Sequence, residues 1–543
     1  MIGDLATHGH PAEPPGASGA SESEDPTPHR GSPVAVTAGE PRLTPPMPSS
    51  GLVGWIGPLL VTAVGAFFRF FRLDQPHAVV FDETYYAKDA WAILHTGYAH
   101  KWPEKANDAI LAGGATFQPE AEYTVHPEVG KWVIGAGEWL FGMNPYGWRF
   151  AVAVLGTLSI LMLARIARRL TRSDVLGTVA GLLLALDGLH LVMSRTALLD
   201  LVLMFFVLGA FGCLLLDRDS SRARLALVAA GQPYRLTGGG PGLGARPWRW
   251  AAAALLGLAC ATKWSGAWYL VAFVLLTVAW DVGARRLAGV ERPYRRLFGS
   301  LAGVGSSFGA ISLGVYLASW TGWLASSGAY YRDWSAKNPG GGWQAWVPDG
   351  LRSLGHYHSE MLRFHTELNN PHPYQSKPWG WPVLARPISY FYEQVDHGVA
   401  GCPADRCARE VLGMGTPLLW WLGTLALVVL VWRWAVNRDW RAGAVLLAVA
   451  AGWLPWFAYS QRTIFYFYAV VFAPFLVLAV VLLLGLVLGP DRASPGRRAV
   501  GALSAGLLVL LIVVCFAFFH PLYTAEPLPI DDWSARMWFR DWI

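Results

Sequence analysis

Two adjacent carboxylates, Asp82 and Glu83, follow shortly after the first strongly apolar stretch of the chain, residues 52–71. The sequence from Glu83 to Leu94 has the pattern of a helix that Gly97 would end, so Asp82 could simply be its N-cap. The alternative is chemical, because carboxylates are costly near lipid and could take the proton of an incoming hydroxyl at the membrane surface. The predicted helix is aromatic and close to a membrane exit, and we therefore favour catalysis.

Cations and imidazoles stand near the same ends of the apolar stretches as the acidic pair. Arg149, Lys263 and Arg462 lie at stretch ends, and His126 and Lys131 open a second short helix between the first two stretches. Each could be an interfacial anchor, or for His126 a helix cap. An arginine is nevertheless costly at a membrane edge unless it meets an anion, and the most available anion is a lipid phosphate. Together these residues predict a phosphate site.

The elements that must position these side chains are membrane-spanning helices. Of the 543 residues, 54% are hydrophobic and only 15% are charged, which indicates an all-α polytopic membrane protein with about eleven transmembrane helices. The predicted spans are 52–71, 148–168, 174–192, 196–216, 248–263, 265–281, 298–319, 413–434, 442–460, 464–488 and 499–519. The net charge of +6 reflects arginines in short loops between spans, so it orients the protein in the bilayer and does not indicate nucleic-acid binding.

Arginine-rich loops fall in alternate gaps, which predicts a cytoplasmic N-terminus, an extracytoplasmic C-terminus and chemistry on the outside. Residues 1–50 lack an apolar run and are expected to be a disordered cytoplasmic tail. In chain order, the remaining predicted units are a catalytic transmembrane region at 51–319 with a first outer loop at 72–147, a large extracytoplasmic loop at 320–412 with interfacial helices, a C-terminal four-helix transmembrane region at 413–519 and an extracytoplasmic tail at 520–543.

Cys402 and Cys407 lie close together on the predicted oxidising face and are expected to form a disulfide. The histidines match no zinc pattern, and no metal site is assigned. A divalent cation held by the adjacent carboxylates stays open, although nothing nearby completes such a site. The acidic and basic residues around the turn 187–200 are interpreted as a local structural ion pair.

The chain resembles the protein O-mannosyltransferase family, in particular its actinobacterial branch. The resemblance covers all but the N-terminal tail and rests on segments that occur in order: Phe81-Asp82-Glu83, His126-Pro127 with Gly130-Lys131, Arg149, Ser194 to Asp200, Lys263 to Gly266, Pro371 to Pro382, and Gln461-Arg462-Thr463. It implies a GT-C glycosyltransferase of the plasma membrane that moves mannose from polyprenyl-phosphate mannose to Ser or Thr of exported proteins, which it could meet at the Sec translocon. The family's acidic pair falls on Asp82 and Glu83, with Asp82 matching the proposed base.

The residues support such a reaction independently. A hydroxyl is a poor nucleophile at neutral pH, so a positioned carboxylate accelerates its attack, whereas a leaving phosphate needs cations and no general acid. These roles predict a single displacement with inversion at the sugar. Two alternatives remain: transfer of another prenyl-phosphate sugar to a lipid or polysaccharide, and a permease, which would show internal repeats and polar groups at mid-membrane.

Overall fold

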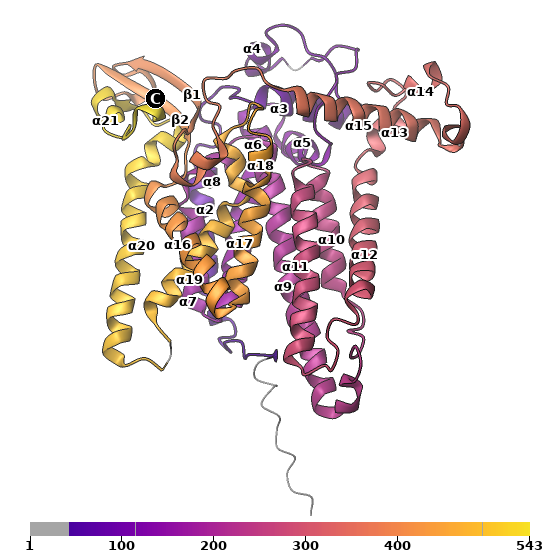
Figure 1. The fold of residues 1–543 in the computed structure, drawn as a ribbon. Coiled ribbons are helices and arrows are strands. Elements are labelled where there is room, and N and C mark those ends of the chain that lie inside the picture. The colour runs from indigo at the N-terminus through magenta and orange to yellow at the C-terminus, as the bar shows by residue number, and fades with distance from the viewer. Residues whose placement is uncertain (1–42, 115, 491) are drawn as a thin grey trace, which may run out of the picture.

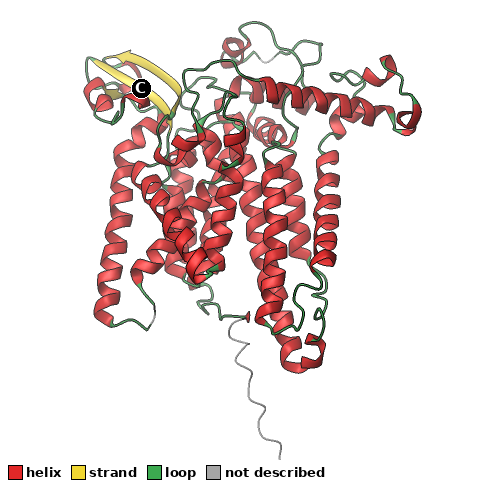
Figure 2. Ribbon diagram, in the orientation of Figure 1, coloured by secondary structure: helices red, strands yellow, loops and turns green. Residues whose placement is uncertain are grey.

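The computed structural model describes residues 43–114, 116–490 and 492–543, and it is predominantly helical, as predicted (Figures 1 and 2). Eight described helices are long and apolar enough to cross a membrane, and a ninth span would be the bent pair α7–α8. The apolar helices are α2 (Val53–Phe70), α6 (Pro145–Thr171), α7 (Asp174–Ala185), α8 (Gly188–Ser194), α9 (Leu199–Gly231), α10 (Pro247–Cys260), α11 (Gly266–Leu287), α12 (Leu297–Ala318), α16 (Pro417–Asn437), α17 (Trp440–Trp453), α18 (Pro455–Ala458), α19 (Ala473–Leu488) and α20 (Pro495–Thr524).

Every predicted span coincides with one of these helices, but three of the spans are shorter or broken. The predicted span 174–192 is the pair α7–α8, which bends by 64°. The predicted span 464–488 begins with the 3-10 helix η5 (Tyr466–Val471) before α19, and α10 has only 14 residues. The ranges proposed for the domains remain predictions.

The bend between α7 and α8 is held by polar side chains that satisfy the backbone groups freed there. Asp187 caps α8, because its Oδ2 accepts a hydrogen bond from the backbone nitrogen of His190 at 3.2 Å. Its Oδ1 accepts from Trp420 Nε1 at 2.8 Å. The buried Arg69 donates to the carbonyl of Ala185, at the end of α7, at 3.4 Å. Such side-chain bonds allow a helix to break inside a membrane.

Helices that lie across the outer ends of the bundle form a layer on one face (Figure 1). They are α3 (Glu83–Thr96), α4 (Ala106–Leu111), α5 (Val129–Phe141), α13 (Thr321–Ala325), α14 (Trp334–Lys337), α15 (Asp349–Glu367) and α21 (Ile530–Ser534). The predicted helix after Asp82 is therefore present and ends where Gly97 adopts a left-handed conformation, as expected. The layer unites the predicted outer segments on the face opposite the arginine-rich loops.

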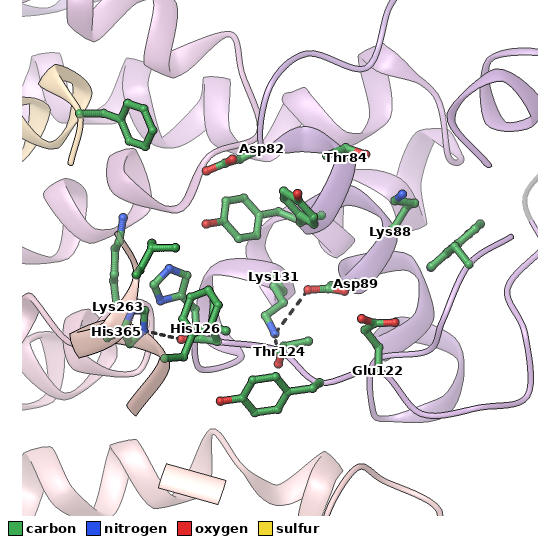
Figure 3. Close-up of a pocket in the computed structure, with 18 of the residues that line it drawn as sticks. Asp82, Thr84, Lys88, Asp89, Glu122, Thr124, His126, Lys131, Lys263 and His365 are labelled. Atoms are coloured by element: carbon green, nitrogen blue, oxygen red, sulfur yellow. Dashed lines mark hydrogen bonds and ion pairs between the residues drawn. The ribbon is translucent and has the colours of Figure 1, made fainter. Parts of the chain in front are cut away.

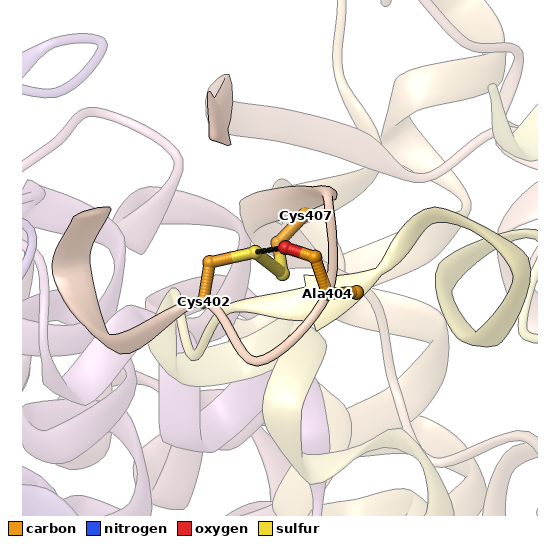
Figure 4. Close-up of a disulfide and its surroundings, with 3 residues drawn as sticks. All are labelled: Cys402, Ala404 and Cys407. Atoms are coloured by element: carbon orange, nitrogen blue, oxygen red, sulfur yellow. Dashed lines mark hydrogen bonds between the residues drawn. A yellow bond between two sulfur atoms is a disulfide. The ribbon is translucent and has the colours of Figure 1, made fainter. Parts of the chain in front are cut away.

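The same layer contains a small antiparallel sheet that the all-α prediction lacks (Figure 2). Strand β1 (Ile388–Asp396) pairs with β2 (Arg406–Gly413), and β2 pairs with the two-residue strand β3 (Leu528–Pro529). The disulfide Cys402–Cys407 closes the connection between β1 and β2 with a Cα–Cα distance of 5.8 Å (Figure 4). The sheet joins the large outer loop to the C-terminal tail.

The first described residues and the C-terminus lie on opposite faces of the bundle (Figure 1). The predicted N-terminal tail falls outside the described residues up to position 42, and Arg168 of α6 holds the part that is described, donating to the carbonyl of Pro48 at 2.9 Å. At the other end, Trp542 is buried and donates from Nε1 to the carbonyl of Leu384 at 2.8 Å. The C-terminus is thus fixed against the outer loop.

Candidate active site

Two adjoining cavities lie under the outer layer, between α3, α5, α15 and the segment that precedes α19. The first has a volume of roughly 560 Å³ and is lined mainly by polar and charged side chains (Figure 3). The second, of roughly 400 Å³, is lined mainly by aromatic and aliphatic side chains. The linings of the two cavities have five residues in common: His126, Lys263, His365, Arg462 and Tyr468. Together they make one site with a polar part and an apolar part.

Asp82 lines the polar cavity and is half-buried at the start of α3. Its side chain makes no capping hydrogen bond to the helix, so the simple N-cap interpretation fails. Burial raises the pKa of Asp82 to about 6, and the nearby Lys263 opposes that rise. A carboxylate with a raised pKa that faces a cavity can take up a proton near neutral pH.

Glu83 turns away from the cavity and forms a completely buried ion pair with Arg149 of α6. Arg149 donates from Nε to Glu83 Oε1 at 2.8 Å and from Nη2 to Oε2 at 2.9 Å. The same carboxylate accepts from the backbone nitrogens of Val80 at 3.0 Å and Ala197 at 3.1 Å. Glu83 therefore fixes the start of α3 to α6 and to the turn before α9. It does not reach the space into which Asp82 points.

Arg149, expected at the donor phosphate, is occupied by other partners. Besides the bonds to Glu83, its guanidinium donates to the carbonyls of Leu73 at 3.3 Å, Pro76 at 3.0 Å and Ala78 at 2.8 Å. Its side chain has no exposed surface and lines neither cavity. The geometry thus places Arg149 against the segment that carries Asp82, and its role at the donor phosphate stays a prediction.

Lys263 lies between the two cavities, in the turn that joins α10 and α11. Its Nζ donates to Asp200 Oδ1 at 3.0 Å and Oδ2 at 2.9 Å. The ammonium also lies 4.3 Å from the centre of the Tyr468 ring. Asp200 was expected to belong to a local ion pair, but it reaches the site through Lys263. A carboxylate in the first turn of an apolar helix is unusual, and this position could have indicated from the sequence that Asp200 belongs to the site.

The local pair expected around residues 187–200 does not form. Arg195 donates to the carbonyls that end α2, including those of Phe71 at 2.8 Å and Arg72 at 2.7 Å. Asp187 is bound to Trp420 and to the start of α8. Arg195 thus binds unsatisfied carbonyls at a helix end, and Asp187 binds at the bend between two helices. Neither contact could be predicted from the short spacing of these residues in the sequence.

Arg462 and two histidines form the boundary between the cavities. Arg462 donates from Nη2 to His365 Nδ1 at 3.5 Å, and His365 donates from Nε2 to the carbonyl of Val125 at 2.7 Å. The His126 and His365 rings are stacked with centres 5.0 Å apart. Burial and the neighbouring cations lower the pKa of His365 to about 4 and that of His126 well below its usual value. Both imidazoles are therefore neutral, and Arg462 has no carboxylate partner among the described residues.

Lys131 of α5 lines the polar cavity beside Asp89 and Thr124, and carboxylates compensate its charge (Figure 3). Its Nζ donates to Thr124 Oγ1 at 3.0 Å and lies 3.5 Å from Glu128 Oε2 and 3.8 Å from Asp89 Oδ2. Burial raises the pKa of Asp89 to about 6. Helix α5 begins at Val129, two residues later than the predicted cap at His126 requires, so His126 serves the cavity and not the helix end.

The apolar cavity lies between α11 and α15. Trp264 and Trp268 contribute to one wall and Leu362 to another. Trp268 is 42% exposed and Leu362 55% exposed, which is typical of surfaces that face lipid. Among the residues that the structure describes, no group of three His, Cys, Asp or Glu side chains could hold a metal ion.

Comparisons with known proteins agree on one family. Residues 59–234 match the family described as dolichyl-phosphate-mannose-protein mannosyltransferase, and residues 351–542 match the C-terminal four-helix transmembrane region of protein-O-mannosyltransferase. The chain is 40% identical over 533 residues to the polyprenol-phosphate-mannose–protein mannosyltransferase of Mycolicibacterium smegmatis strain MKD8, covering 96% of this chain and 99% of that protein. It is 39% identical over 506 residues to the protein of the same name from Mycobacterium tuberculosis, covering 91% and 93%.

A solved structure is similar over almost the same length. The S. cerevisiae protein O-mannosyltransferase complex bound to its sugar donor contains a chain that superposes with a TM-score of 0.69 at 14% identity, covering 91% of this chain and 93% of that one. At this identity the likeness shows the fold, which is the expected GT-C arrangement of helices.

Proposed function

The chain belongs to the protein O-mannosyltransferase family, and we propose that it transfers mannose from polyprenyl-phosphate mannose to Ser and Thr hydroxyls of exported proteins. The observation that carries this proposal is the junction of the two cavities. A half-buried carboxylate, Asp82, faces the polar cavity, and two cations, Lys263 and Arg462, stand where that cavity meets an apolar one. A lipid-linked sugar phosphate has the same order of apolar, anionic and polar parts.

We place the prenyl chain in the apolar cavity and its phosphate between Arg462 and Lys263. Arg462 is the stronger candidate, because it has no carboxylate partner among the described residues, whereas Lys263 is already bound to Asp200. Lys263 still has a third N–H for a phosphate oxygen. His126 and His365 are neutral and add no charge. Both ring nitrogens of His365 already have partners, whereas His126 Nδ1 has none among the described residues and could hydrogen-bond the donor.

The sugar then extends into the polar cavity toward Asp82. Lys131, Thr124 and Asp89 line this space, and their combined donors and acceptors suit sugar hydroxyls better than a phosphate, because the carboxylates offset the ammonium charge. We therefore reassign Lys131 from the phosphate to the sugar.

The proposed reaction is a single displacement. Asp82 accepts the proton of a Ser or Thr hydroxyl, the hydroxyl oxygen forms the new bond to the anomeric carbon, and the bond from that carbon to the phosphate oxygen breaks. The departing polyprenyl phosphate is already an anion and needs no proton, so the cations stabilise the charge that grows on it. Attack opposite the leaving group inverts the anomeric configuration.

In the cell, we place the enzyme in the plasma membrane with this site on the extracytoplasmic side. Acceptor polypeptides would meet it in an extended state as they leave the Sec translocon. An extended state is expected because a cavity of roughly 560 Å³ admits a short segment of chain and not a folded domain.

Asp82→Asn tests the proposal. In membranes supplied with labelled polyprenyl-phosphate mannose and a Ser/Thr-rich peptide, loss of the base is expected to reduce transfer by roughly 10²–10⁴-fold. Asp108→Asn, which removes an exposed carboxylate of α4 outside both cavities, should keep wild-type activity. Normal transfer by Asp82→Asn, or label that reaches lipid and never peptide, would contradict the assignment.

A further inference from the structure

A large cavity lies at the other end of the bundle, on the face opposite the candidate active site. It has a volume of roughly 880 Å³ and is bounded by the ends of α7, α16, α17, α19 and α20. Leu430, Leu482 and Leu486 contribute to its apolar wall, and Arg172, Arg433 and Arg441 to its polar rim. The mechanism proposed above uses none of these residues.

Arg172, Arg433 and Arg441 share too few carboxylates to be neutralised, and Asp174, a further carboxylate of the lining, pairs with Arg168. Arg433 and Arg441 both pair with Asp439, at 3.3 Å and 2.8 Å. Arg172 lies 3.4 Å from Asp219, which also pairs with Arg169 at 2.7 Å. Between a fifth and about a third of the side-chain surface of Arg172, Arg433 and Arg441 stays exposed. An anion can therefore reach positive charge that the described residues leave uncompensated.

We propose that this cavity binds an anionic phospholipid of the inner leaflet. The phosphate would lie among Arg172, Arg433 and Arg441, and an acyl chain would lie along the leucine wall. Guanidinium groups bind phosphate oxygens through paired hydrogen bonds, and anionic lipids concentrate at the cytoplasmic surface. The bound lipid would fill the space between α20 and its neighbours and hold that helix to the bundle.

The N-terminal segment of the chain is the main competing occupant. Residues 1–42 contain more acidic than basic side chains, including Glu22, Glu24 and Asp25, and the described chain begins beside the cavity, where Pro48 contributes to its wall. The segment has no apolar run that would cover Leu430, Leu482 and Leu486. A phospholipid matches both the charged rim and the apolar wall, so we favour the lipid.

Native mass spectrometry of the full chain in a neutral detergent tests the proposal. Phosphatidylglycerol and phosphatidylcholine with identical acyl chains are added in turn, and the lipids retained per protein are counted. We expect selective retention of phosphatidylglycerol. Each lost guanidinium should weaken it about fivefold, so Arg172→Gln combined with Arg441→Gln should weaken it about 25-fold. Arg235→Gln combined with Arg292→Gln removes two exposed inner-loop cations outside the cavity and should change nothing.

A second variant guards against misfolding of the arginine variant. Ala502→Trp places a large ring in the cavity and leaves every charge in place, so it should also abolish retention while mannosyl transfer continues. Equal retention of both lipids, or loss in the control variant, would overturn the proposal. Displacement of phosphatidylglycerol by excess inorganic phosphate would reduce the cavity to a free-anion site. Stronger retention after Glu22→Gln, Glu24→Gln and Asp25→Asn would identify the N-terminal segment as the occupant.

Discussion

Asp82 and Glu83 are neighbours in the chain, yet their carboxylates occupy different surroundings. The Asp82 side chain faces a cavity, whereas both oxygens of Glu83 bind Arg149 and backbone nitrogens. An ion pair as closed as this cannot also bind a substrate or share a metal ion with Asp82. The acidic pair thus separates into one residue suited to proton transfer and one that determines where the first residue lies.

The pH dependence of transfer should report the ionisation of Asp82. As the proposed base, Asp82 must be deprotonated, and burial raises its pKa to about 6. We therefore expect kcat/KM to fall about tenfold per pH unit below 6 and to level off above 7. Steady-state assays with mannosyl donor and peptide between pH 5 and about 8 measure this profile. The neighbouring His365, whose pKa is about 4, stays neutral over the range.

Asp89 is the group that could mimic this result, because burial raises its pKa to about 6 as well. Asp89→Asn removes that ionisation and leaves Asp82 in place. The acidic limb should therefore persist in Asp89→Asn, at whatever rate the variant retains. A flat profile in this variant would assign the limb to Asp89.

At the scale of elements, the Glu83–Arg149 pair connects α3, α6 and the turn before α9. Because the pair is fully buried, removing either partner leaves an uncompensated charge, which typically costs about 3–5 kcal/mol of stability. Arg149→Ala and Glu83→Ala should each lower the melting temperature in detergent clearly. In the fraction that remains folded, the KM for the lipid-linked donor should stay within about twofold of wild type, since a cost in stability need not change the contacts of the substrate.

A paired substitution separates this structural role from direct phosphate binding. Glu83→Met combined with Arg149→Met removes both charges and should destabilise less than the sum of the single changes. A large increase in donor KM in Arg149→Ala, with an unchanged melting temperature, would instead return Arg149 to the phosphate site.

Elements with a strong periodic or apolar pattern were predictable from the sequence, and contacts between distant elements were not. The helix from Glu83, its end at Gly97 and the positions of the spans follow from local patterns. The Lys263–Asp200 pair and the environment of Arg149 depend on how α3, α6, α9 and α10 approach one another. The positions of the cations at the outer ends of the predicted spans indicated that they would lie near one another. They did not indicate which of these cations would be paired with a carboxylate.

The small sheet was missed for a similar reason. Strand β1 alternates in burial, but its partner β2 follows the Cys402–Cys407 turn. Strand β3, which pairs with β2, follows the whole C-terminal transmembrane region. A strand of two residues such as β3 has no periodicity to detect. Its existence depends on the final position of the C-terminal tail, where Trp542 is buried against the outer loop.

For the whole molecule, the two faces of the bundle differ in the chemistry they expose. Asp82, Arg462 and the apolar cavity lie at the end of the bundle that the outer layer covers, whereas the opposite face carries arginines that outnumber the carboxylates they pair with. The orientation that the positive-inside rule predicts brings the candidate base to the side where exported proteins emerge. It also brings the arginine-rimmed cavity to the leaflet rich in anionic lipid.

Cysteine labelling in intact cells tests this orientation directly. Ser534→Cys, in α21, should react with a membrane-impermeant maleimide, whereas Thr237→Cys, on the opposite face, should react only after the membrane is permeabilised. Both positions are exposed, and the free cysteines Cys213, Cys260 and Cys515 are first replaced by Ser while the disulfide is kept. A permeant maleimide labels both variants and serves as the control. The reverse pattern of labelling would place the candidate active site in the cytoplasm and exclude transfer to exported proteins at this site.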